Sequence, residues 1–442
     1  MKKPSIFSVV VTLVALATAP AAASNWPQWR GPEGTGSAPG SEPPVSFSET
    51  ENIRWKVAIP GYGHASPVIW DDLVFVLTAV ETADRPVEEP PAEGERRRRG
   101  IVPGGPVRFV VMALDRNTGA VVWEHTAIEE TPHEGTHPDG TWASASAATD
   151  GDMVFAHFGS RGLFAYDMSG NPKWSLDLGD QETRNGFGEG SSPAVWGDFV
   201  IVTWDHEGDS FIVALDRETG EERWRQERSE RTSWATPVVI EVNGRPQVIA
   251  NATERIRAYD LETGEIVWEA SGMTVNTIPT PVFGDGIIYT MSGFRGSSLL
   301  AIDIAEASGD ITGTDVIRWS YDHDTPYVPS PLLHGDKLYI LKGNTGILTS
   351  FDAQTGDVLY GPVRLPGIEG MYASPVGAGD KVYIAGRDGT VVVIANGPEF
   401  DVVAENTLDE GFDASPAVSG DAIFLRGRSH LYCVARSERQ AP

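Results

Sequence analysis

The stretch Ala214-Leu-Asp-Arg-Glu-Thr-Gly-Glu-Glu-Arg-Trp224 decides the fold, because its pattern Ala-x-Asp-x-x-Thr-Gly-x-x-x-Trp recurs along the chain. Further copies cover residues 113–123 and 258–268, and residues 350–360 keep the turn and end in Tyr360. In each copy the aspartate carboxylate can accept turn amides, and the glycine can adopt a positive φ without steric cost. The pattern therefore indicates two strands joined by a tight turn.

A second signal, Ser or Thr before Pro, marks where each repeat begins. Eight such openings occur, of which only the one at Ser146 lacks the proline: Ser66, Ser146, Ser192, Thr236, Thr280, Ser330, Ser374 and Ser415. From Ser146 onward they lie 41 to 50 residues apart. Repeats of this length, with four short β-rich runs each, are typical of propeller blades, as in WD40-like proteins. We therefore predict an all-β, eight-bladed β-propeller of four-stranded antiparallel blades over residues 53–435.

The ring must also close. The last repeat ends before it has room for a fourth strand, and the run Ile53–Val57 has the form of that strand, with Trp55 in the tryptophan position. We expect this N-terminal strand to complete the eighth blade and leave no open sheet edge. Six tryptophans are expected to pack structurally between blades: Trp55, Trp123, Trp174, Trp224, Trp268 and Trp319.

Four segments lie outside the repeats: a signal peptide (1–23), an irregular segment expected to wrap the surface (24–52), a flexible insertion in the first blade (81–106) and a C-terminal tail (436–442). Lys2 and Lys3, an apolar run and small residues before Ser24 are typical of a cleavable signal peptide. No cysteine stands beside the cleavage site, so no lipid anchor is expected there. We therefore expect a periplasmic or secreted monomer without a transmembrane anchor.

Charge and cysteine content exclude several classes of function. The formal charge of −28 repels phosphate backbones and anionic lipid heads, so nucleic acid is not an expected partner. Cys433 is the only cysteine, which rules out an internal disulfide and a c-type haem site.

The repeat units resemble those of the pyrroloquinoline-quinone-like (PQQ-like) propeller superfamily. That superfamily includes quinoprotein alcohol dehydrogenases and the BamB-type outer-membrane assembly scaffold. A closer resemblance, to uncharacterised exported PQQ-like propellers of bacteria, rests on residues 26–34, 55–67 and 183–193. The resemblance to the dehydrogenases implies a quinone held by calcium in the channel. The vicinal disulfide it also implies cannot form here, and no residues match the calcium ligands of that group.

In a propeller, the loops that enter the innermost strands converge on one face around the central channel. The residues just before the eight openings are therefore the candidate ligand-binding set: Tyr62, His64, Trp142, Arg184, Asn185, Glu189, Trp234, Asn276, Tyr327, Tyr372 and Asp413. This mixture suits a small polar or glycan ligand or a peptide segment. These side chains could equally do no more than plug and hydrate the channel mouth.

His133 and His137 suggest a metal site, with His64 as a third ligand. Their four-residue spacing favours zinc on a helix, but here it falls in a Pro/Gly-rich loop. No nucleophile, base and orienting acid can be assembled from spacing alone, so no catalytic residue is predicted.

Three functions remain after these observations. We expect a non-catalytic binding or protein-interaction scaffold in the bacterial envelope, without a cofactor. The alternatives are a PQQ- or metal-dependent oxidoreductase with its site in the channel, and a carbohydrate-binding module that stacks sugars on Trp142, Trp234, Tyr327 and Tyr372.

Overall fold

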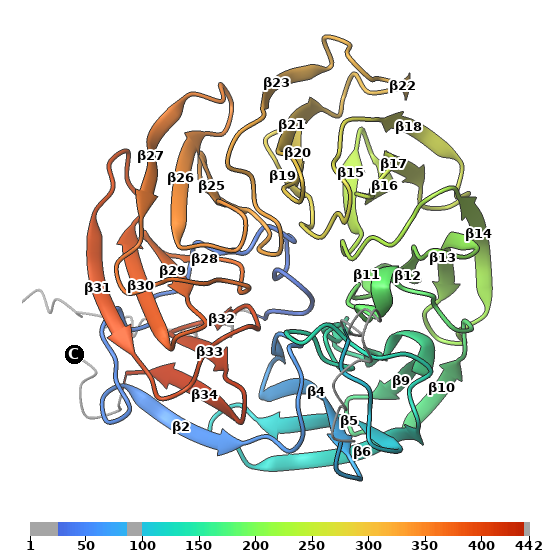
Figure 1. The fold of residues 1–442 in the computed structure, drawn as a ribbon, viewed down its shortest axis with the longest axis vertical. Coiled ribbons are helices and arrows are strands. Elements are labelled where there is room, and N and C mark those ends of the chain that lie inside the picture. The colour runs from blue at the N-terminus through green and yellow to red at the C-terminus, as the bar shows by residue number, and fades with distance from the viewer. Residues whose placement is uncertain (1–24, 86–99, 437–442) are drawn as a thin grey trace, which may run out of the picture.

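Eight sheets stand side by side around a central channel in the computed structural model, which describes residues 25–85 and 100–436 (Figure 1). Each sheet is a blade whose strands run in sequence order from the channel to the rim, except in the last blade. The prediction of an eight-bladed all-β propeller is confirmed. The predicted signal peptide and residues 86–99 of the predicted insertion, which include the basic run Arg96–Arg99, lie outside the described residues.

The first four blades contain strands β3 to β18. Blade 1 has β3 (Val68–Trp70), β4 (Leu73–Glu81), β5 (Val107–Asp115) and β6 (Val121–Glu130). Blade 2 has β7 (Ala148–Thr149), β8 (Met153–His157), β9 (Leu163–Asp167) and β10 (Pro172–Leu176). Blade 3 has β11 (Ala194–Trp196), β12 (Phe199–Trp204), β13 (Ser210–Asp216) and β14 (Glu222–Arg228). Blade 4 has β15 (Val238–Val242), β16 (Arg245–Ala250), β17 (Ile256–Asp260) and β18 (Ile266–Ala270).

The other four blades complete the ring. Blade 5 has β19 (Val282–Gly284), β20 (Ile287–Ser292), β21 (Ser298–Asp303) and β23 (Ile317–Tyr321). Blade 6 has β24 (Leu332–His334), β25 (Lys337–Leu341), β26 (Ile347–Asp352) and β27 (Val358–Arg364). Blade 7 has β28 (Val376–Ala378), β29 (Lys381–Ala385), β30 (Thr390–Ala395) and β31 (Val402–Thr407). Blade 8 has β32 (Ala417–Ser419), β33 (Ala422–Arg426), β34 (His430–Ala435) and β2 (Ile53–Ala58).

Four small elements add to these sheets and loops. Two-residue strands β1 (Ser37–Ala38) and β22 (Gly309–Asp310) pair parallel with β28 and β18. Two 3₁₀ turns, η1 (Gly159–Arg161) and η2 (Arg184–Gly186), lie in the loops of blades 2 and 3. No helix of the described part of the chain is long and apolar enough to cross a bilayer.

The ring closes as the sequence predicts. The N-terminal strand β2 pairs antiparallel with β34 from Ile53 opposite Val434 to Ala58 opposite His430. The first and last parts of the propeller are therefore joined within one sheet (Figure 1). The second and third strands of the blades are buried on both faces, since each blade packs between two others, whereas the outermost strands alternate between exposed and buried residues.

A tryptophan on the outermost strand of one blade contacts the turn of the next. The indole Nε1 donates to the carbonyl of the residue after the turn aspartate at five interfaces: Trp55 to Arg116 (2.9 Å), Trp123 to Met168 (3.0 Å), Trp174 to Arg217 (2.9 Å), Trp224 to Leu261 (2.6 Å) and Trp319 to Ala353 (3.1 Å). The turn glycine lies under the ring, and a Cβ at Gly264 would come within 2.6 Å of Trp224. The repeated glycine is therefore needed for close approach as well as for its φ of +73°.

A second set of contacts joins the blades around the channel. The backbone N–H of each opening Ser or Thr donates to the hydroxyl of the next opening residue, over distances of 2.8 to 3.3 Å, at seven of the eight interfaces, from Ser66 through to Ser415. At the eighth interface the Ser66 hydroxyl has no partner among the described residues. The small polar residue at each opening is therefore a link in a ring of hydrogen bonds.

The first part of the N-terminal segment departs from its prediction. Instead of wrapping the surface, residues 26–38 run through the channel beside the innermost strands. Trp26 pairs with Ile69 of blade 1, the Arg30 guanidinium donates to the Pro331 carbonyl of blade 6, and β1 pairs with β28 of blade 7. Trp26 and Arg30 are each only 1% exposed. The apolar and hydrogen-bonding surface inside the channel outcompetes solvent for this Trp-rich segment.

The contact between glycine and indole can be tested with a matched pair of glycines. Gly264→Ala and Gly244→Ala place a Cβ at nearly the same φ, +73° and +76°, but only Gly264 has an indole above it, while Gly244 has open space. We expect both variants to lose roughly 1–2 kcal/mol from left-handed strain. Gly264→Ala should lose about 1–3 kcal/mol more from overpacking.

Urea unfolding of the two variants and the parent protein measures the difference. Equal losses for the two alanine variants would show that the indole does not depend on a close approach to the turn.

Candidate binding site at the channel mouth

The loops that enter the innermost strands meet over a pocket of about 230 Å³. Six of the eleven predicted residues line it, from six different blades: His64, Glu189, Trp234, Tyr327, Tyr372 and Asp413. Opening residues such as Ser192 and Thr280 also line the pocket. Trp29 of the N-terminal segment donates its Nε1 proton to the Thr280 hydroxyl over 3.0 Å. Because that segment occupies the channel below, Trp29 forms the floor of the pocket.

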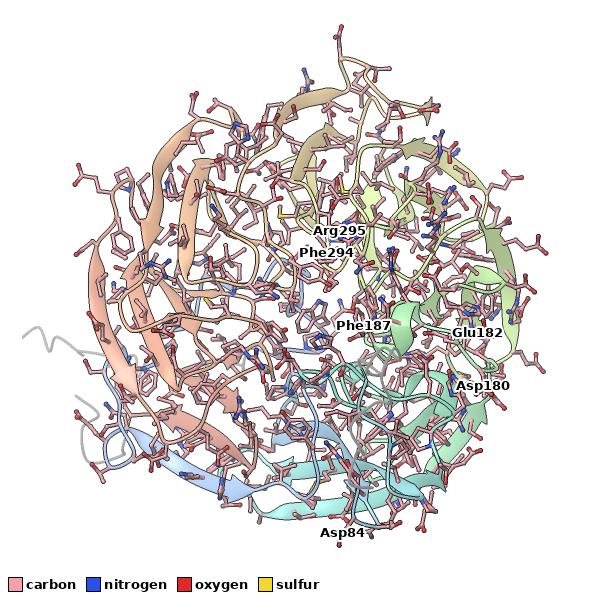
Figure 2. All side chains as sticks on the ribbon, in the orientation of Figure 1. Asp84, Asp180, Glu182, Phe187, Phe294 and Arg295 are labelled. Atoms are coloured by element: carbon pink, nitrogen blue, oxygen red, sulfur yellow. The ribbon has the colours of Figure 1, made fainter. Side chains whose placement is uncertain are left out.

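Aromatic side chains form much of the wall and are held in place by other protein groups. The Trp234 indole donates to the Gly188 carbonyl over 2.7 Å, and Tyr327 stacks on Phe294 with ring centres 4.7 Å apart. Phe187 meets the His137 ring edge-on at 4.9 Å. Figure 2 shows Phe187, Phe294 and Arg295 near the centre of the ring. The wall is therefore organised before any ligand arrives.

An ion-pair network crosses one side of the pocket. Arg387 donates to Asp413 Oδ1 over 2.6 Å and to Asp139 Oδ1 over 2.8 Å, and its guanidinium lies 4.1 Å from the Tyr372 ring centre. The Tyr372 hydroxyl donates to Asp139 Oδ2 over 3.0 Å. Burial raises the pKa of Asp139, but hydrogen bonds from Arg387 and Tyr372 outweigh it and lower that pKa below its ordinary value. Burial, together with the Asp139 charge, raises the pKa of Tyr372. The network thus favours the ionised form of Asp139 and occupies the guanidinium.

Asp413 and His64 leave hydrogen-bonding capacity unused beside this network. The Asp413 side chain is only 2% exposed, and its Oδ2 lies 3.5 Å from His64 Nε2, too far for a good hydrogen bond. Neither atom has another partner among the described residues. Burial lowers the pKa of His64 to about 4, so the ring is neutral at pH 7. A buried carboxylate oxygen without a donor is a place where a ligand can contribute one.

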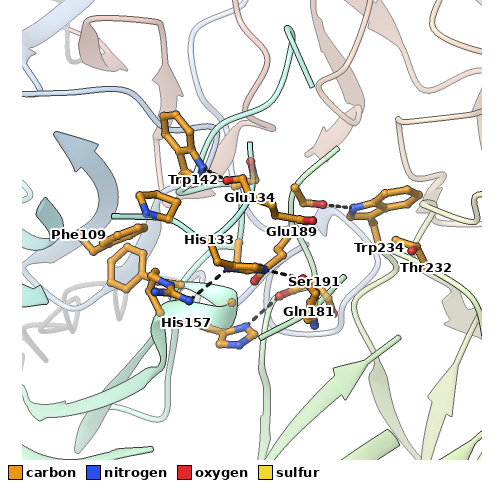
Figure 3. A pocket seen from close by; sticks show the side chains of 18 of the residues that line it. Phe109, His133, Glu134, Trp142, His157, Gln181, Glu189, Ser191, Thr232 and Trp234 are labelled. Atoms are coloured by element: carbon orange, nitrogen blue, oxygen red, sulfur yellow. Dashed lines mark hydrogen bonds between the residues drawn. The ribbon is translucent and has the colours of Figure 1, made fainter. Parts of the chain in front are cut away.

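A smaller cavity of about 40 Å³ adjoins the pocket, and Glu189 lines both. Figure 3 shows His133, Glu134 and Glu189 together in this cavity, with Trp142 and Trp234 on its two sides. Glu189 accepts hydrogen bonds from the Ser160 backbone N–H (2.5 Å) and hydroxyl (2.6 Å). Burial nevertheless raises the pKa of Glu189 to about 7.

The other predicted residues lie around these two cavities. Tyr62 packs edge-on against His64, with ring centres 5.1 Å apart. Arg184 and Asn185 form part of η2, and Asn276 is buried. His133 lies in the small cavity and His137 lines the large pocket, so the two histidines of the predicted metal pair face different spaces.

Sequence analysis missed Asp139, Arg387, Phe187 and Trp29. Arg387 lies in the turn between the second and third strands of blade 7, and such turns open on the same face as the entering loops. Reading those turns as well would have found Arg387. Asp139 lies in the loop that also carries His133 and His137, but no spacing rule indicates where such a loop folds.

The chain is similar in sequence to one family of known proteins. The model of a family described as outer membrane protein assembly factor BamB matches residues 107–361. BamB of Francisella salina is 24% identical over 170 residues, which are 38% of this chain and 30% of that protein. BamB of Yersinia pestis is 27% identical over 305 residues, or 65% of this chain and 67% of that protein. The chain thus aligns with less than a third of the Francisella protein.

Two solved structures are similar in fold. BamB from Moraxella catarrhalis has a TM-score of 0.57 and 15% identity, covering 86% of this chain and 98% of that one. The quinohemoprotein alcohol dehydrogenase ADHIIG from Pseudomonas putida HK5 also has a TM-score of 0.57, at 11% identity, covering 95% and 81%. At these identities the likeness concerns the fold alone.

The neutral, buried His64 predicts a dependence of stability on pH. The folded pKa of about 4 lies below the ordinary 6.5, so the unfolded chain binds a proton between these values while the folded chain does not. Acidification from pH 6.5 to 4 should therefore lower the free energy of unfolding by up to about 3 kcal/mol through this group. The groups that act on His64 are Asp413, which favours the charged form, and Arg426, Arg387 and Arg428, which oppose it.

Unfolding free energies of the parent protein and His64→Asn, measured between pH 4 and 7, test this. The variant should lose part of the slope, whereas His323→Asn, at a largely exposed histidine, should keep it. Identical slopes in the parent and His64→Asn would mean that His64 is protonated in the folded state.

Proposed function

The chain belongs to the BamB family of PQQ-like β-propellers, and on that premise we propose that it is a non-catalytic interaction scaffold of the bacterial envelope. In this proposal the channel-mouth pocket receives a segment of a partner protein. The names of the relatives point to proteins of outer-membrane assembly as the class of partner.

The size and rigidity of the pocket carry the proposal. Its volume of about 230 Å³ is below the roughly 300–1,000 Å³ of ordinary small-molecule sites. One or two protein side chains fit such a space better than a large cofactor does. Because Trp234, Tyr372 and Tyr327 are already held by other groups, binding costs little ordering of the wall.

The charges of the pocket favour a basic segment. Asp139, Glu189 and Asp413 line it, and lysine and arginine are absent from its described lining. The nearby Arg387 is already paired with two carboxylates. A partner lysine or arginine could donate to Asp413 Oδ2 while its charge lies against the faces of Trp234 or Tyr372.

The quinone with calcium that the dehydrogenase resemblance implies does not fit these residues. Pyrroloquinoline quinone carries three carboxylates, and acidic lining without a free cation disfavours it. Calcium needs six to eight converging oxygens, and three of the four carboxylate oxygens of Asp139 and Asp413 already accept hydrogen bonds from Arg387 or Tyr372. We therefore derive no redox step for this chain.

Location in the envelope is part of the proposal. Lys2, Lys3 and the apolar run after them support export, and the two BamB relatives support a place in outer-membrane assembly. The acidic surface keeps the protein away from anionic lipid heads and favours a soluble docking role.

Site-specific photo-cross-linking in the host bacterium tests the docking pocket. A photoreactive residue in place of Phe187, at the channel mouth, should cross-link to a protein of outer-membrane assembly. Asp413→Asn should weaken that cross-link several-fold, because it removes the acceptor charge. The same probe at Val358, which is 47% exposed on the outer strand β27, is the matched control. Cross-linking from Val358 but not from Phe187 would contradict docking in the pocket.

Calorimetric titration of residues 24–442 with pyrroloquinoline quinone, with and without calcium, tests the alternative. We expect no saturable heat. One-to-one binding that is lost in Trp234→Ala would overturn the scaffold proposal in favour of an oxidoreductase. Saturable binding of a glycan, lost in the same variant, would favour a carbohydrate-binding module.

A further inference from the structure

Three metal-ligating side chains meet in the small cavity beside the channel. Potential ligand atoms of His133, Glu134 and Glu189 all lie within 4.8 Å of one another. His133 and Glu134 come from the connection between β6 and β7, and Glu189 comes from the connection between β10 and β11. The cluster therefore spans two loops that belong to different blades, 55 residues or more apart in sequence.

Hydrogen bonds orient each of the three side chains. His133 Nε2 lies 2.7 Å from the Gln181 carbonyl, so it carries the proton, and Nδ1 accepts from Arg161 Nη2 over 3.2 Å, a hydrogen bond that a metal ion at Nδ1 would replace. Glu134 accepts from the Thr183 N–H (3.2 Å) and hydroxyl, and Glu189 accepts from Ser160. Backbone carbonyls and hydroxyls hold ligands in this way behind metal sites in proteins.

The two carboxylates lack a cation. No lysine or arginine of the described residues forms an ion pair with Glu134 or Glu189. Arg161 also lines the cavity, but its guanidinium contacts His133 Nδ1 and pairs with Glu130 and Asp180. Two like charges in a partly buried space need a counter-charge or a proton.

A fourth group in the same cavity independently indicates a missing ligand. His157 lines the cavity and is only 3% exposed, and its Nδ1 lies 3.2 Å from the Ser191 carbonyl. Its Nε2 is buried without a partner among the described residues. The cavity of about 40 Å³ exceeds the ~10–15 Å³ that one water needs, so it can hold an ion with a water bound to it. Such a water could donate to His157 Nε2.

We propose that His133, Glu134 and Glu189 form a binding site for a divalent transition-metal ion, with zinc as the best fit. One imidazole and two carboxylates with a water in the fourth position match zinc chemistry, whereas calcium and magnesium prefer all-oxygen sites. Zinc–ligand bonds of about 2.0–2.2 Å require the three side chains to close inward by roughly 1 Å. The ion would join the two loops and fix Glu189 in the wall of the channel pocket.

Zinc titration of tag-free, chelator-treated protein tests the site. We expect one zinc ion per chain, and at least tenfold weaker binding of calcium and magnesium, measured by calorimetry and by competition with a chelating dye. His133→Ala and Glu189→Gln should each weaken zinc binding at least tenfold. Zinc should raise the Tm of the parent protein but not of these variants, since the ion binds only the folded state.

His137→Ala is the matched control, because His137 lies four residues away in the same loop but lines the channel pocket. It should bind zinc as the parent does. His133 is partly exposed, so His133→Ala keeps the test valid if Glu189→Gln fails to fold. No zinc binding, or binding that survives His133→Ala and is lost in His137→Ala, would overturn the proposal.

Discussion

The packing of an indole onto the turn of the next blade is the interaction on which the rest of the structure depends. Blades in a propeller contact one another only through their faces, so each interface needs contacts that fix its angle. The tryptophan–glycine contact fixes the outer edge, as with Trp224 on Gly264, and the Ser/Thr hydrogen bonds fix the inner edge, as from Ser192 to Thr236. Because both edges are held, the loops at the channel mouth have fixed relative positions, as a binding site requires.

The N-terminal segment supports the ring where the repeated contact is missing. Blade 6 ends in Tyr360 rather than tryptophan, and blade 7 has no aromatic at that position. At blade 7 the segment pairs β1 with the innermost strand, and the Phe47 N–H donates to Asn406 Oδ1 on the outermost strand over 2.8 Å. Near blade 5 the Trp268 indole has no acceptor among the described residues. The turn there is longer, and its strand β22 covers β18 instead. The same segment carries Trp29 to the floor of the pocket, so ring closure and pocket depth have a common origin.

The repeat pattern was enough to predict the fold and the closing strand, because each copy encodes a local turn and the spacing encodes the blade. It also predicted six of the residues around the pocket, since position relative to each opening follows from the blade geometry. It could not predict the partners of those residues. Asp139 meets Arg387 across 248 positions of sequence, and Glu189 meets His133 across 56, in loops whose paths depend on tertiary packing. The four-residue spacing of His133 and His137 was uninformative because no helix places them on one face.

Fold likeness does not distinguish a scaffold from a dehydrogenase here, since BamB and the quinohemoprotein superimpose equally well. The distinction rests on which charges face the pocket. Arg387 is turned toward Asp139 and Asp413, so the surface that remains is acidic and aromatic. Glu189 stands between this pocket and the small cavity, and its charge is therefore shared by both. A cation held in the cavity would draw that carboxylate away from the pocket and reduce its attraction for a basic segment. Binding in the two spaces is then coupled through one side chain, and the coupling must act equally in both directions.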